Sequence, residues 1–155
     1  MGIPNSNRSE RLEKLAPLLA ASTYALTSKE TEDYNCIAWA LGDTKQWWWP
    51  TPRYACYWPP GVNRDNTLAT VRRIFEIHGY RVCENAISEI GFEKVALYEH
   101  AVFGIEHVSR QLQTGKWTSK VGELEDIQHS SPLDLEIEDY GVVRMIMKRP
   151  RKDWI

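Results

Sequence analysis

Apolar residues recur at helical spacing in three stretches of the first half of the chain. Residues 8–20 carry a stripe of leucines that Pro17 interrupts, so a kinked helix or two short helices are expected there. Residues 34–41 predict a short helix that Gly42 ends. Residues 66–78 predict a third helix, because their apolar side chains fall on one side. The first half is therefore expected to be mainly helical.

The second half of the chain predicts strands instead. Short runs of apolar and β-branched residues occupy 80–83, 94–98, 105–112, 116–121 and 142–147. Thr114-Gly115, between two of these runs, marks a hairpin turn. Helices followed by neighbouring strands are typical of the α+β class. We therefore expect N-terminal helices packed on an antiparallel sheet of about four to five strands.

Composition and charge narrow the class of protein. The 155 residues predict one domain over 1–155, with flexible ends at 1–7 and 149–155. Hydrophobic residues make up 43% and charged residues 26%, as in ordinary globular domains. A formal net charge of −2 is unsuited to binding through phosphate contacts, so no nucleic-acid partner is expected.

The sequence also bears on compartment and cofactors. It has neither the apolar core of a signal peptide nor the roughly 18 apolar residues of a membrane span, so no membrane partner is expected. Three cysteines without a CxxC pair predict reduced thiols and a cytoplasmic location, and leave export by a specialised secretion system open. No ligand spacing of a known metal site is present, so neither a metal nor a cofactor is predicted.

Cys36 is the first candidate for chemistry. It lies in the first turn of the predicted helix 34–41, where free backbone N–H groups and the helix dipole favour a thiolate. A thiolate is the nucleophilic form of cysteine, so this position suits covalent catalysis. The alternative is a small core residue, because free cysteines are among the most buried residue types.

A nucleophilic cysteine needs a base, and the chain has four histidines. His78 ends a predicted helix, and His100 lies between two predicted strands. His107 is the best candidate, because a strand holds an imidazole rigidly against a helix packed on the sheet.

Two short motifs resemble those of papain-like cysteine hydrolases, in particular the NlpC-type and CHAP-type amidases. The segment Asn35-Cys36-Ile37-Ala38-Trp39 is similar to their cysteine motif, and His107-Val108 followed by Thr114-Gly115-Lys116-Trp117 is similar to their histidine motif. The resemblance implies a papain-like fold, with Cys36 attacking a carbonyl and His107 as the base. It also places Asn35, Trp39 and Trp117 beside the substrate, with the backbone N–H of Cys36 stabilising the oxyanion.

The chain also resembles an uncharacterised bacterial domain family through three sequence motifs in the same order, NCIAWALGD, GKWTSKVG and DIQH. That resemblance spans most of residues 33–148 and implies no activity.

The third catalytic residue is Ser119, Asp126 or His129. A two- or four-residue turn at Thr114-Gly115 would point Ser119 to the face opposite His107, whereas a three-residue turn would reverse this. Asp126 is the favoured candidate, because a carboxylate fixes the tautomer of a histidine and supports the imidazolium. A helix cap or a surface charge is its alternative role.

An aromatic stretch between residues 47 and 58 is the other unusual feature. Its rings are Trp47, Trp48, Trp49, Tyr54, Tyr57 and Trp58. They could form a binding wall, but a loop that buries most of its own rings is expected. The sequence thus predicts a cysteine hydrolase or acyl transferase acting on a peptide or other amide bond. The alternative is a non-catalytic module that binds a protein partner through segment 47–58.

Overall fold

In the part of the chain that the structure describes, seven strands form one antiparallel sheet in the order β1-β6-β5-β4-β3-β7-β2. The computed structural model describes residues 8–51 and 56–152. The strands are β1 (Ala25–Leu26), β2 (Arg81–Cys83), β3 (Phe92–His100), β4 (Gly104–Gln111), β5 (Trp117–Lys120), β6 (Asp126–His129) and β7 (Val142–Pro150). The helices are α1 (Glu10–Leu15), α2 (Cys36–Ala40) and α3 (Leu68–Ile77), with 3-10 turns η1 (Pro17–Ala21) and η2 (Pro132–Leu135).

The three predicted helices are present, each shorter than its apolar pattern. Pro17 divides the first stretch into α1 and η1, as expected from its missing N–H. Asn35 caps α2 by accepting a hydrogen bond from the backbone of Ala38. Thr67 caps α3 in the same way, so side-chain caps fix where both helices begin.

The predicted fold class is wrong. The molecule is β-rich, and its helices are few and short beside a seven-stranded sheet, whereas helices packed on four to five strands were expected. The sequence pattern misses β1, which is only two residues long, and β6, in which Ile127 is the single apolar residue. Both strands are held by backbone pairing with each other, and β6 also pairs with β5. Pairing of this kind leaves no hydrophobic alternation in the sequence.

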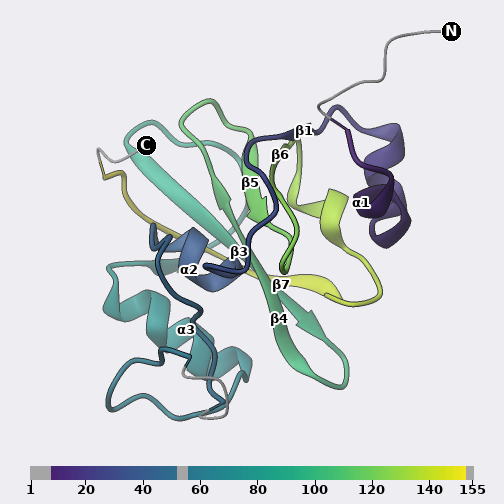
Figure 1. Cartoon of the computed structure of the whole chain (residues 1–155). Coiled ribbons are helices and arrows are strands. Elements are labelled where there is room, and N and C mark those ends of the chain that lie inside the picture. The colour runs from purple at the N-terminus through teal and green to yellow at the C-terminus, as the bar shows by residue number, and fades with distance from the viewer. Residues whose placement is uncertain (1–7, 52–55, 153–155) are drawn as a thin grey trace, which may run out of the picture.

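The helices lie on both sides of the sheet (Figure 1), and each face of the sheet has its own hydrophobic core. The helices α2 and α3 pack on one face, over Val95, Leu97 and Val108. The turns η1 and η2 and the helix α1 cover the other face, over Ala96 and Tyr98. Since side chains alternate along a strand, successive residues of β3 and β4 belong to different cores.

A close approach before β7 depends on Gly141. Its φ of +79° is in the left-handed region, and a Cβ at this position would overlap the carbonyl oxygen of Glu99 in β3. Only glycine allows this contact, which places the preceding residue, Tyr140, beside the sheet.

The C-terminal segment that was predicted to be flexible, 149–155, begins too early, because β7 extends to Pro150. Arg149 lies inside β7 with 3% of its surface exposed, and it forms an ion pair of 2.5 Å with the buried Glu93. Its guanidinium also donates to the carbonyl oxygen of His78. Residues 1–7 and 153–155, predicted to be flexible as well, lie outside the described residues. No helix in the described ranges is long and apolar enough to cross a membrane.

Candidate functional site

The Cys36 thiol lies at the base of a pocket and against strand β4. Cys36 is 7% exposed and belongs to the core under α2. Burial raises the pKa of this thiol to about 11, although backbone hydrogen bonding from Val108 and Ile37 acts in the opposite direction. The resting group is therefore a neutral thiol. The expected thiolate is absent because α2 has only five residues, and its N–H groups do not outweigh the burial.

Asn35 has a structural role beside Cys36. Its side-chain oxygen accepts hydrogen bonds from the backbone of Ala38 and, at 3.1 Å, of Trp48. Its amide nitrogen donates to the carbonyl oxygen of Trp48 at 2.9 Å. Asn35 also lines the pocket, but these bonds tie it to α2 and to the aromatic segment.

His107 is the end of a buried hydrogen-bond chain. Its Nε2 lies 3.1 Å from the hydroxyl of Ser119, which lies 2.8 Å from Nε2 of His129. Nδ1 of His129 lies 2.8 Å from the carbonyl oxygen of Ser131. The side chains of the first three residues are at most 1% exposed. Four groups from β4, β5, β6 and the following turn are thereby joined.

The chemistry of these groups sets the direction of every bond in the chain. Burial lowers the pKa of His107 and of His129, so both rings are neutral and each has one N–H. The Ser131 carbonyl can only accept, so Nδ1 of His129 donates to it, and its Nε2 accepts from the Ser119 hydroxyl. Ser119 in turn accepts from Nε2 of His107. Nδ1 of His107 is left as an unprotonated acceptor, and it has no hydrogen-bond partner.

Two tyrosines hold the His107 ring. Tyr140 stacks on it with ring centroids 4.2 Å apart and an interplanar angle of 5°. Tyr98 meets it edge-on at 4.9 Å. Tyr140 also lines the pocket beside Cys36 and interacts electrostatically with that thiol. Sequence reasoning missed Tyr140, and the sequence offers no signal for it beyond the adjacent Gly141.

Cys36 and His107 reach the same segment of β4 from different sides. The backbone of Val108, the residue after His107, contacts the Cys36 thiol, while the His107 ring points to the face that carries Tyr98 and Ser119. The two side chains share no hydrogen bond in this structure. Their side chains lie on opposite faces of the sheet, and Tyr140 both stacks on His107 and lines the pocket that contains Cys36.

Ser119 is the residue that orients His107. The β4–β5 pairing matches Arg110 with Thr118 and Gln111 with Trp117, which leaves residues 113–115 as a three-residue hairpin loop. This register places Ser119 on the same face as His107. Of the turn lengths that the sequence left open, the structure has the three-residue turn, and not the two- or four-residue turn that would point Ser119 away from His107.

Asp126 does not perform the orienting role that was predicted for it. It pairs with Lys120 across β5 and β6, on the face opposite Ser119. One of its oxygens accepts a hydrogen bond of 2.5 Å from the Tyr34 hydroxyl. Burial raises the pKa of Asp126, and bonds from Tyr34 and the charge of Lys120 oppose that shift. It therefore belongs to the packing of residues 28–34 against the sheet.

The two predicted substrate-contacting tryptophans lie outside the pocket. The Trp39 indole donates to the hydroxyl of Thr118 at 3.0 Å and lies under the guanidinium of Arg110. Trp117 is 2% exposed and packs in the core on the opposite face of the sheet. Both rings stabilise the fold, and neither lines the pocket over Cys36.

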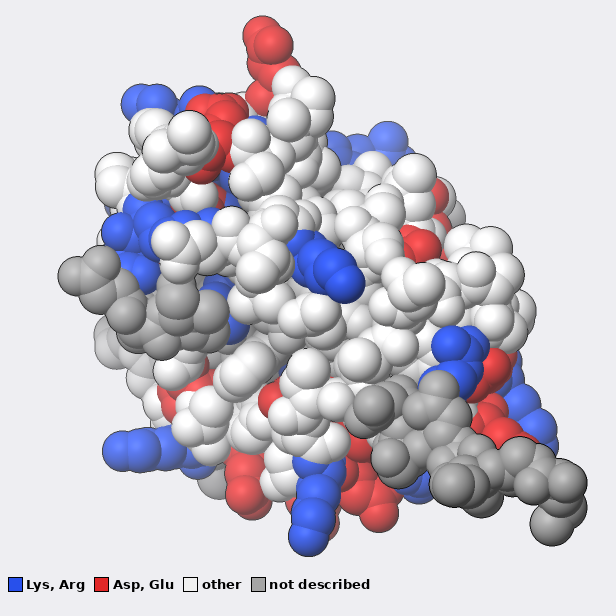
Figure 2. Space-filling model, turned by 90° about the horizontal axis from the view of Figure 1, so that it is seen from above, with Lys and Arg blue, Asp and Glu red and all other residues white. Residues whose placement is uncertain are grey.

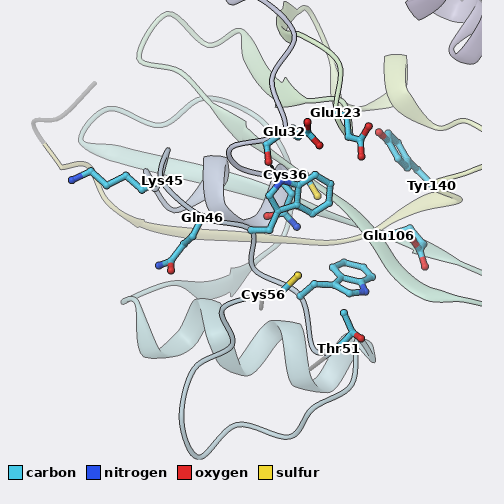
Figure 3. Close-up of a pocket in the computed structure, with 13 residues that line it drawn as sticks. Glu32, Cys36, Lys45, Gln46, Thr51, Cys56, Glu106, Glu123 and Tyr140 are labelled. Carbon is cyan, nitrogen blue, oxygen red and sulfur yellow. Dashed lines mark hydrogen bonds between the residues drawn. The ribbon is translucent and has the colours of Figure 1, made fainter. Parts of the chain in front are cut away.

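The pocket over Cys36 has a volume of about 1040 Å³. Its wall includes the rings of Trp47, Trp49 and Tyr140. Figure 3 shows Glu123 and Tyr140 to one side of Cys36, whereas the side chain of Lys45 points away from it. This cavity is large enough for a peptide-sized ligand.

The aromatic segment buries fewer of its rings than expected, and two of the half-buried rings, Trp47 and Trp49, line the pocket. Trp48 and Trp58 are buried, and the other described rings, Trp47, Trp49 and Tyr57, are half-buried. Tyr54 lies outside the described residues. Backbone hydrogen bonds between Tyr57 and both Trp47 and Trp49 fold the segment over the pocket.

A family described as "Domain of unknown function (DUF7689)" matches residues 25–148. The chain belongs to this family. The DUF7689 match begins at β1 and ends within β7, so it includes Cys36, the His107 chain and the pocket. Comparison with curated proteins gives no match, and comparison with solved structures gives none either.

The donor sets of the described residues do not suit a metal ion. Within residues 8–51 and 56–152, no group of three or more His, Cys, Asp or Glu side chains is arranged to hold one. All three cysteines are free. His107, His129 and Cys36 are buried in this DUF7689 domain.

The buried histidines predict that the domain loses stability in acid. His107 and His129 have pKa values below the ordinary 6.5 when folded, so the unfolded chain binds more protons below about pH 6.5. The free energy of unfolding should therefore fall as the pH drops below 6.5, by up to about 1.4 kcal/mol per pH unit for each histidine. Urea midpoints between pH 7.5 and 5 measure this. A flatter profile in His129→Gln, and an unchanged one in the exposed-site variant Glu84→Gln, are expected.

Proposed function

We propose that this DUF7689 domain is a cysteine hydrolase or acyl transferase acting on an amide bond. The nucleophile is Cys36, and His107 takes the thiol proton through Nδ1. The observation that carries the proposal is the hydrogen-bond chain from His107 through Ser119 and His129 to Ser131, because it leaves Nδ1 as a free acceptor. A histidine whose other nitrogen is bonded in this way is oriented as a general base.

The state of the thiol defines how such a reaction begins. Both Cys36 and His107 are neutral at rest, so the thiol proton moves to Nδ1 as the sulfur attacks the carbonyl carbon. The leaving amine then takes that proton from His107, and an acyl-thioester remains on Cys36. Water or a second amine releases the acyl group. Before attack, Cys36 and His107 must be brought together, because they face different sides of β4 and the Tyr140 ring covers His107.

A binding module is the second candidate, and two observations favour it. The Cys36 pKa of about 11 makes the thiol a weak nucleophile at rest, and no hydrogen bond joins Cys36 to His107 in the described residues. In this alternative the pocket and the half-buried rings of Trp47 and Trp49 hold a protein partner without reaction. On the face seen in Figure 2, the centre is largely uncharged and acidic and basic side chains are dispersed around it.

Selective acylation separates the two candidates. p-Nitrophenyl acetate is an activated acyl donor, and mass spectrometry of the digested protein measures how fast each cysteine is acetylated. If the proposal is right, the buried Cys36 is acetylated faster than the half-buried Cys56 and Cys83, because the proposed mechanism gives a general base to Cys36 and not to the other two thiols. Slower acetylation of Cys36 than of Cys56 contradicts the enzyme and supports the binding module.

A further inference from the structure

The pocket over Cys36 adjoins a second cavity. The second cavity has a volume of about 730 Å³ and shares Glu106, Gly122, Glu123 and Tyr140 with the first. Tyr140 therefore stands at the junction, with Cys36 on one side of it. A ligand chain seated at Cys36 can extend past Tyr140 into the second cavity.

The charge along this two-part groove is strongly one-sided. Five carboxylates line it: Glu32, Glu106, Glu123, Glu138 and Asp139. Among the described residues, the basic side chains that line it are Lys45, which Figure 3 shows pointing away from Cys36, and His100 in the second cavity. For the whole protein the formal charge is only −2, so the groove concentrates negative charge that the chain as a whole balances.

These carboxylates are available to a ligand. Among the described residues, Glu32, Glu106 and Glu123 form none of the ion pairs that hold other acidic side chains, such as Glu93 with Arg149. An exposed pair contributes at most about 1 kcal/mol, so a single carboxylate here would select little. Several of one sign in one groove add their fields, and low-dielectric walls strengthen the sum.

Aromatic ring faces give the groove a second reason to prefer a cationic ligand. The rings of Trp47, Trp49 and Tyr140 line the cavity that also contains the thiol. The face of an aromatic ring attracts an ammonium or guanidinium group, and indole is the strongest of the common rings. Carboxylates and ring faces therefore favour the same ligand charge, and the long methylene chain of a lysine suits the apolar part of the wall.

We propose that the groove takes a basic peptide, with lysine or arginine side chains on both sides of the amide bond at Cys36. That the bound peptide is a substrate rests on the proposed function. The binding site itself is defined by the cavity, the thiol and the aromatic rings. The carboxylates determine its specificity. A neutral peptide would lose the electrostatic attraction, and an acidic peptide would be repelled.

Three capped tetrapeptides test the inference by binding alone. The probes are acetyl-Gly-Lys-Gly-Lys-amide and its analogues with norleucine or glutamate in place of lysine, and norleucine is lysine without the ammonium group. Titrations follow the indole N–H signals of Trp47 and Trp49 by NMR. The lysine peptide is expected to bind at least about tenfold more tightly than the norleucine peptide at low salt, and this ratio should shrink at high salt. Equal binding of the two, or tighter binding of the glutamate peptide, overturns the inference.

Charge variants assign the preference to the groove. The double variant Glu106→Gln, Glu123→Gln should lose most of the preference for lysine. The exposed Glu32→Gln variant tests the same prediction if the double variant does not fold. Glu84→Gln removes an exposed carboxylate outside both cavities and should leave the preference unchanged. A preference that survives in both groove variants contradicts the inference.

The same titration in Cys36→Ala separates this inference from the proposed function, because that variant binds without reacting. Selective acetylation of Cys36 together with equal binding of the lysine and norleucine peptides overturns only the specificity. A lysine preference without selective acetylation of Cys36 overturns the proposed enzymatic function. The preference for cationic peptides then belongs to a binding pocket that carries out no reaction.

Discussion

Acetylation of Cys36 by p-nitrophenyl acetate is expected to slow about 10²–10⁴-fold when His107 is replaced by alanine. The effect is the usual size for loss of a general base, and it is large here because the thiol is neutral at rest. The measurement is the first-order rate of p-nitrophenolate release from protein whose fold has been checked by near-ultraviolet circular dichroism.

Two further variants make this result specific to the His107 chain. Ser119→Ala leaves His107 in place but no longer fixes which of its ring nitrogens carries the proton. We therefore expect a smaller loss of acetylation rate than in His107→Ala, and a changed pH–rate profile. His78→Ala removes a half-buried histidine at the end of α3 and should leave the rate unchanged. If His78→Ala and His107→Ala slow the reaction equally, His107 is not the base.

Replacing Glu93 with alanine is expected to lower the free energy of unfolding by about 3–5 kcal/mol. This change leaves the guanidinium of Arg149 buried without its carboxylate partner, and an uncompensated buried charge is strongly destabilising. Urea unfolding measures the loss. Glu99→Ala is the matched control, since Glu99 pairs with Arg144 on the surface at 3.0 Å and should cost less than about 1 kcal/mol.

The double replacement of Glu93 and Arg149 by methionine tests the reason for that loss. Removing both charges should restore much of the stability, because an apolar pair of similar length has no buried charge to compensate. A double variant as unstable as Glu93→Ala would mean that packing around Tyr80, and not the charge, is what the substitution disrupts.

The helices were predictable because their signals are local. Pro17 breaks the first stretch, and Asn35 and Thr67 supply caps at the points where α2 and α3 begin. The strand β6 was not predictable, because Asp126 and His129 are polar and are buried only through partners distant in the chain. Missing β6 and its partner β1 made the sheet too small and the fold class wrong.

The candidate site was partly predictable for the same reason. Cys36 and His107 carry local motifs, and the structure brings both to the segment around Val108. Asp126 was favoured over Ser119 because a carboxylate orients a histidine well, but the pairing register of β4 and β5 was unknown. That register depends on how many residues the hairpin loop contains. Tyr140 lies far from both motifs in the chain, and its contact with His107 depends on Gly141 approaching β3.

The three-residue loop at 113–115 gives the site an unusual sensitivity to insertions and deletions. Exposed hairpin loops normally tolerate a change in length, because no packed side chain depends on them. Here one residue more or less would shift the pairing of β5 by one position and turn Ser119 away from His107. The length of this loop should therefore be retained among DUF7689 proteins that keep the histidine chain, even where the residues at 113 and 114 differ, whereas the φ of +92° at Gly115 favours glycine there.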